Sequence, residues 1–133
     1  MQTNMGAWNL SPWDNDKAAD WFGALFDELP LAAKVEKTLN LDVNLHHEEI
    51  RAAAALLIML GRTNVWPIDK LDRHLELAID RMEALRPIYQ ELGGDDWVRA
   101  LDSELAVLKA RLANDPNLAT PAQPSSWGEF WGR

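Results

Sequence analysis

The chain contains no cysteine among its 133 residues, which excludes disulfide bonds, thiolate metal ligands and a cysteine nucleophile. It also lacks a long apolar run, because the longest, residues 52–60, is well short of the roughly 18 residues that span a bilayer. The first six residues have neither the basic stretch nor the apolar region of a secretory signal. These absences lead us to expect a cytoplasmic protein with no membrane-spanning segment.

Basic residues are scarce relative to acidic ones. The chain has 13 lysines and arginines against 21 aspartates and glutamates, which gives a formal net charge of −8. An acidic domain repels phosphate groups, and no cluster of lysines or arginines offsets that repulsion, so we expect no binding to nucleic acid. Two explanations of the charge stay open: it keeps the protein soluble, or it attracts a basic protein partner.

The signatures of common catalytic sites are missing as well. There is no glycine-rich phosphate loop, and no serine lies in a nucleophile-elbow context. The run His46-His47-Glu48-Glu49 lacks the His-Glu-x-x-His spacing of zinc enzymes, and adjacent residues of a helix point about 100° apart. We therefore interpret this run as a solvated helix start, expect no metal and no cofactor, and favour a protein that is not an enzyme.

The sequence does contain helical periodicity, and strand-like alternation is absent. Within residues 16–29 one stripe is apolar, at spacings of three and four residues, which predicts a helix that packs this stripe on a core. The stripe consists of Ala18, Trp21, Phe22, Leu25, Phe26 and Leu29. Asp14 or Asn15 can cap the start of this helix, and Pro30 ends it.

Further helices are predicted at about residues 31–39, from a cap at Asn44 to a stop at Gly61, from Ile68 onward, and over residues 95–112. The Ala/Leu-rich stretch 52–60 is apolar on every face, so we expect it to be surrounded by the other helices. Pro87 is expected to break or kink its helix, Gly93-Gly94 to turn the chain, and Asp69 to pair with Arg73. The fold class is thus all-α: a compact bundle of about five helices in one domain, residues 1–115.

Residues 116–133 differ in composition from the rest and predict an extended, proline-rich tail. Its end carries three aromatic residues, which rarely remain fully solvated. These tail aromatics are Trp127, Phe130 and Trp131. Two destinations stay open for them: the surface of their own domain, or a groove on a second copy of the chain, which would make a homodimer.

One longer motif lies near the N-terminus: Gly6-Ala7-Trp8, followed by the run Trp13-Asp14-Asn15-Asp16-Lys17-Ala18-Ala19-Asp20-Trp21. This motif resembles the opening signature of a bacterial family described only as a domain of unknown function, number four-two-five-nine. Residues 52–62 and 85–112 resemble later parts of the family, so the resemblance covers about residues 5–113. The chain departs from the family at residues 9–12, which replace its glycines, and near Ala54, where a glutamate is expected. The resemblance implies a helical fold and a bacterial origin, and it implies no activity.

The aromatic and acidic residues of this motif form a candidate binding surface, the N-terminal patch. It consists of Trp8, Trp13, Asp14, Asn15, Asp16 and Asp20. One interpretation is structural: the indoles cover the first helix, and the polar residues cap it. The other is functional: the patch binds a basic protein, as in a non-enzymatic accessory or immunity-type domain that masks a toxin. The alternative function is a hydrolase or metal-dependent enzyme that uses Asp14, Asp16 and Asp20, or the residues His46, His47 and Glu49.

Overall fold

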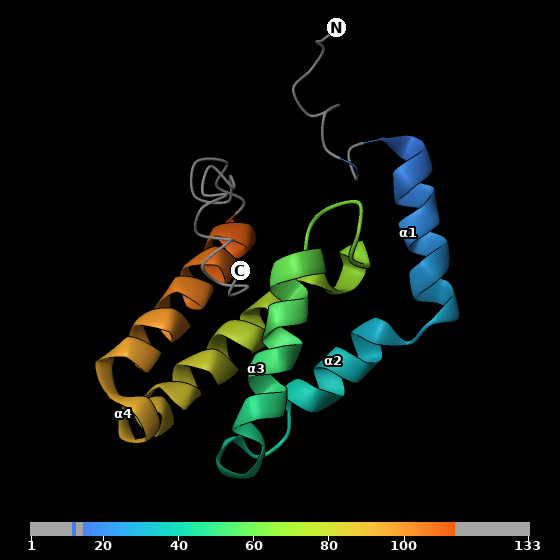
Figure 1. Cartoon of the computed structure of the whole chain (residues 1–133). Helices are drawn as coiled ribbons and strands as arrows, with labels where there is room; N and C mark the ends of the chain where they lie inside the picture. The colour runs from blue at the N-terminus through green and yellow to red at the C-terminus, as the bar shows by residue number, and fades with distance from the viewer. Residues whose placement is uncertain (1–11, 13–14, 114–133) are drawn as a thin grey trace, which may run out of the picture.

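The computed structural model describes residue 12 and residues 15–113, and the regular elements in that part of the chain are all helices (Figure 1). They are α1 (Asp16–Glu28), α2 (Leu31–Leu39), α3 (Val43–Leu60) and α4 (Ile68–Ala113). The predicted all-α class is confirmed. None of the four helices is long and apolar enough to cross a membrane. The predicted tail, residues 116–133, lies outside the described residues.

Helix α4 contains a sharp bend at Gly94, whose φ of 72° and ψ of −155° are not helical. The bend divides α4 into a first arm (residues 68–93) and a second arm (residues 95–113), which run side by side in Figure 1. Ion pairs join the arms, such as Lys109 Nζ to Glu83 Oε2 at 3.0 Å. We expected about five helices and the described residues form four, because the two segments that meet at Gly93-Gly94 make up one bent element.

The first arm of α4 differs from two expectations. Pro87 lies inside the helix and does not break it, since Gly94 is the residue of α4 with non-helical backbone angles. The predicted pair between Asp69 and Arg73 is absent: Arg73 donates to Glu36 of α2 at 2.8 Å, and Asp69 lies 3.7 Å from Lys70.

Hydrogen bonds and close contacts between neighbouring residues determine where α1 and α3 begin and where α3 ends. Asn15, one of the two predicted caps, caps α1, because its side-chain oxygen accepts from the backbone N–H of Ala18 at 2.8 Å. The predicted cap of α3 at Asn44 is wrong: Asp42 caps this helix, and the Asn44 N–H donates to the Asp42 carboxylate at 2.8 Å. Gly61 ends α3 where predicted, and a Cβ atom there would come within 2.4 Å of the Leu57 carbonyl oxygen.

The core forms where α3 packs against α2 and against α4. Its most deeply buried side chains come from these three helices and from the α3–α4 connection. They include Leu39, Ile50, Leu57, Trp66, Leu75, Met82, Leu85, Leu101, Leu105 and Leu108. However, α3 is not surrounded as expected, because Ala52 and Met59 are exposed. The helices around α3 therefore leave one strip of it uncovered.

Helix α1 stands to the side of the other helices (Figure 1). None of its 13 residues is buried, although Phe26 reaches the core and meets the Trp66 ring edge-on at 5.1 Å between centroids. Trp21 is 62% exposed. The helix forms as predicted, but the expectation that its apolar stripe is buried is wrong, since the described helices contact it mainly at Phe26.

Candidate functional site

The described part of the N-terminal patch consists of Asn15, Asp16 and Asp20, and all three are exposed. Asn15 has a structural role as the cap of α1. Asp16 lies in the first turn, where its charge favours the positive end of the helix dipole. The other members of the patch, Trp8, Trp13 and Asp14, lie outside the described residues, as do the tail aromatics Trp127, Phe130 and Trp131.

The histidines singled out by the sequence do not form a metal site. In the part of the chain that the structure describes, no three histidine, cysteine or acidic side chains are grouped so that they could hold a metal ion. His46 Nδ1 lies 3.4 Å from Glu49 Oε2 at the surface, whereas the His47 ring packs edge-on against Tyr89. The described residues therefore give no support to a metal site built on His46, His47 and Glu49. The expected solvated helix start is also wrong for His47, which is half-buried.

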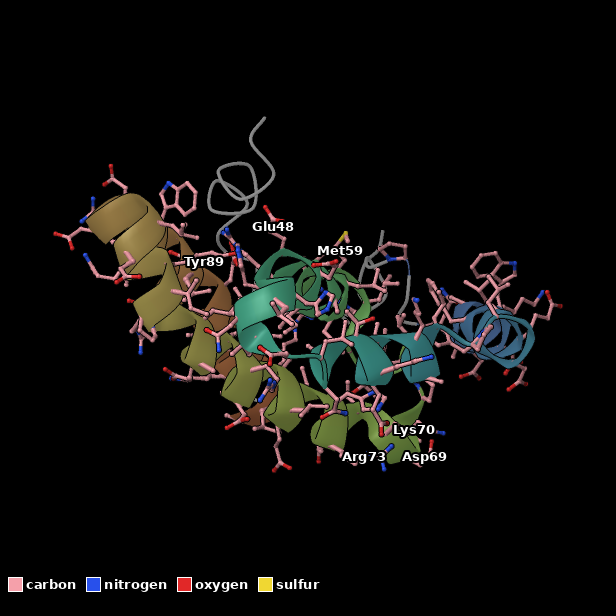
Figure 2. The ribbon with its side chains drawn as sticks, turned by 90° about the horizontal axis from the view of Figure 1, so that it is seen from below. Glu48, Met59, Asp69, Lys70, Arg73 and Tyr89 are labelled. Carbon is pink, nitrogen blue, oxygen red and sulfur yellow. The ribbon has the colours of Figure 1, made fainter. Side chains whose placement is uncertain are left out.

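A cleft of about 430 Å³ opens between α3 and the two arms of α4. Its walls combine aromatic, charged and small apolar side chains. They are His47, Glu48, Arg51, Ala52, Ala55, Ile58, Tyr89, Trp97 and Glu104. In the view of Figure 2, Glu48 and Tyr89 lie in the upper part of the molecule, whereas Asp69, Lys70 and Arg73 lie at its lower side. Ala52, from the uncovered strip of α3, thus lines a defined cleft.

Tyr89 is the buried centre of the cleft and contacts three of its other residues. His47 and Trp97 both meet the Tyr89 ring edge-on, with centroids 5.5 Å and 5.7 Å away. The Arg51 guanidinium lies over the same ring at 5.3 Å from its centroid, a cation–π arrangement. Since these residues come from α3 and from both arms of α4, the bend at Gly94 is what brings them together.

Arg51 and Glu104 form a two-bond ion pair in the cleft. Arg51 Nε donates to Glu104 Oε1 at 2.8 Å, and Arg51 Nη2 donates to Glu104 Oε2. The hydrogen bond to Glu104 raises the pKa of Arg51 above its ordinary value. The fork geometry directs the charge of Arg51 at Glu104 and uses two of the five guanidinium N–H donors.

Two groups at the cleft have no partner among the described residues. The Glu48 carboxylate is exposed and makes no hydrogen bond or ion pair with them. The Nδ1 atom of His47 is buried and also lacks a hydrogen bond. A buried polar atom without a partner costs about 1–3 kcal/mol. The cleft therefore contains an unpaired carboxylate, whereas the charge of its guanidinium is balanced by Glu104.

The position of Trp97 depends on the glycine one helical turn before it. A Cβ atom added to Gly93 would lie 2.1 Å from an atom of the Trp97 indole. The indole therefore lies directly on the backbone of Gly93, and it remains 48% exposed. Gly93-Gly94 serves two purposes: Gly94 bends α4, and Gly93 makes room for the indole.

The polar side chain of His74 is fully buried in the core. The Trp66 indole N–H donates to His74 Nδ1 at 3.1 Å, so the imidazole proton is on Nε2, which donates to Glu36 Oε1 at 2.7 Å. This bond lowers the pKa of Glu36. Because both ring nitrogens are engaged and His74 is fully buried, we assign it a structural role that joins α2, the connection and α4.

Comparisons of the chain with protein-family models, with curated protein sequences and with solved structures find no match. The resemblance to the bacterial family of unknown function therefore stays a prediction.

Proposed function

We propose that this protein is a non-enzymatic binding or accessory domain that engages a basic protein partner through α1 and the N-terminal patch. The observation that supports this proposal best is the 62% exposure of Trp21 on a helix with no buried residue. Tryptophan is enriched among the residues that dominate binding energy at protein interfaces. An exposed indole on a helix that contributes little to the core is suited to that use.

The charge of α1 supports a basic partner. Asp16, Asp20, Asp27 and Glu28 are all exposed along the helix, against the single base Lys17. Such a surface accelerates encounter with a positively charged protein and disfavours acidic ones. An immunity-type role, in which α1 covers the basic surface of a toxin, is the specific form of this proposal.

The alternative function, a hydrolase or metal-dependent enzyme built on Asp14, Asp16 and Asp20, has weaker support. Asp16 and Asp20 are exposed and form no hydrogen bond with other described side chains. Catalytic and metal-binding carboxylates are usually held in place by such bonds. No observation on the described residues favours this alternative.

The test is capture of partners from native bacterial lysate by the tagged full chain, compared with its Trp21→Ala variant. The matched control is Leu45→Ala, which also removes a large exposed side chain but on α3. We expect Trp21→Ala to weaken capture of a basic protein by about 30-fold, the effect of a binding hot spot of about 2 kcal/mol. Leu45→Ala should leave it unchanged. Equal capture by both variants, with unchanged helicity, would rule out α1 as the binding surface.

A further inference from the structure

We propose that the cleft beside Tyr89 is a binding site for a primary ammonium group, such as the lysine side chain of a protein partner. This site is separate from α1 and does not depend on the function proposed for that helix. Three features of the described residues support the proposal: the unpaired Glu48 carboxylate, the exposed aromatic surface and the charge of the cleft.

The unpaired carboxylate of the cleft calls for a ligand that donates hydrogen bonds. The charge of Arg51 is balanced by Glu104, which it bonds through two of its nitrogens. The Glu48 carboxylate has no partner among the described residues. An ammonium group carries three N–H donors and no acceptor, which matches this arrangement.

The surface of the cleft also fits the shape of an alkylammonium chain. Trp97 presents a half-exposed indole, and tryptophan is the ring that attracts cations best. Ala52, Ala55 and Ile58 line the same cleft with small apolar groups. A lysine stem can cover such apolar surface while its charged end contacts Glu48 and the indole.

The net charge favours a cation over an anion. Arg51 and Glu104 neutralise each other, and the unpaired Glu48 leaves one negative charge. An anion in the cleft would meet the Glu48 carboxylate and a guanidinium that is already bonded. A neutral apolar ligand would leave Glu48 unused, so a lysine-type ligand is the one that Glu48, Trp97 and the apolar lining residues favour together.

The experiment is an NMR titration of the full chain at pH 7, which follows the indole N–H of Trp97 after its assignment with Trp97→Phe. The probe is Nα-acetyl-lysine methylamide. Its norleucine counterpart has a similar stem without the ammonium, and its glutamate counterpart carries the opposite charge. A further titration with n-butylammonium shows whether the cleft binds a free amine as well as it binds a lysine within a peptide. We expect saturable shifts with lysine, and no saturable shift with norleucine or glutamate.

The variants assign the interaction to the cleft. Glu48→Gln removes the free charge at constant size, and Gly93→Ala displaces the Trp97 indole; each should weaken lysine binding about two- to fivefold. The control is Glu49→Gln, whose carboxylate is next in sequence but contacts His46 outside the cleft, and it should leave affinity unchanged. Equal shifts with norleucine, no saturable shift with lysine, or an unchanged affinity of Glu48→Gln would each overturn the proposal. Glu48 is exposed and unpaired, so loss of folding would not explain its result.

Discussion

The buried imidazole of His74 offers a sharp test of the forces that hold the three core helices together. Substitution of His74 by phenylalanine keeps a flat ring and removes both nitrogens. Trp66 is only 2% exposed, and its indole N–H then has no acceptor. A buried donor without a partner costs about 1–3 kcal/mol. Glu36 loses a bond too, but its side chain is 38% exposed and regains water, so its loss adds little. We expect His74→Phe to lower the free energy of unfolding by about 1–3 kcal/mol.

Urea unfolding followed by circular dichroism at 222 nm measures this loss. Because phenylalanine is larger than histidine, part of any loss can come from overpacking, at a similar cost of about 1–3 kcal/mol. The same substitution in a Trp66→Phe background separates the two causes, since no indole N–H is then left unsatisfied. We expect His74→Phe to cost at least about 0.5 kcal/mol less in that background. An equal cost in both backgrounds would refute the assigned role of the Trp66–His74 hydrogen bond.

Three further predictions concern stability and oligomeric state. The pKa of Glu36 is lowered by the His74 hydrogen bond and by Arg73, so its stabilising effect is present above the unfolded value of about 4.3 and is lost as pH falls through the folded pKa. Urea unfolding should therefore show wild type more stable than Glu36→Gln at pH 6, and nearly equal to it at the acid end. Gly94→Ala should destabilise by about 1–2 kcal/mol because φ is 72°, whereas the control Gly23→Ala, on exposed α1, should stabilise by about 0.5–1 kcal/mol. Equal thermal shifts of these two variants would contradict this explanation. The last prediction rests on the sequence alone: serine at all three tail aromatics should lower the melting temperature, because the aromatic rings no longer gain by docking on their own domain, and the mass by light scattering should stay near 15.0 kDa. A wild-type mass of twice that value would instead favour the homodimer.

The positions of the helices could be predicted because their signals are local. The Asn15 cap, the Pro30 boundary and the Gly61 stop depend on neighbouring residues, and each is found where the sequence placed it. The effect of Pro87 could not be predicted in the same way. A proline inside a helix removes one backbone hydrogen bond and crowds the carbonyl four residues earlier, and whether the packing of the helix outweighs this cost depends on tertiary contacts that the sequence does not show.

The burial of α1 was mispredicted for a related reason. A stripe at helical spacing shows where the apolar side of a helix lies, but not whether another element covers it. Among the described residues the core is formed by α2, α3 and α4, which leaves Trp21 exposed. The same periodicity therefore fits a core helix and a docking helix.

The cleft could not be located from the sequence because its residues come together only after α4 reverses. Arg51 and Glu104 are 53 residues apart, and nothing local to either one marks the other as its partner. One signal was available: residues 52–60 are apolar on every face, more than α2 and the two arms of α4 cover. The excess of apolar surface then had to be exposed or to line a binding site. The structure directs Ala52 and Ala55 into the cleft with Tyr89 and Trp97, so an apolar excess on a central helix of a small bundle is itself a reason to look for a ligand there.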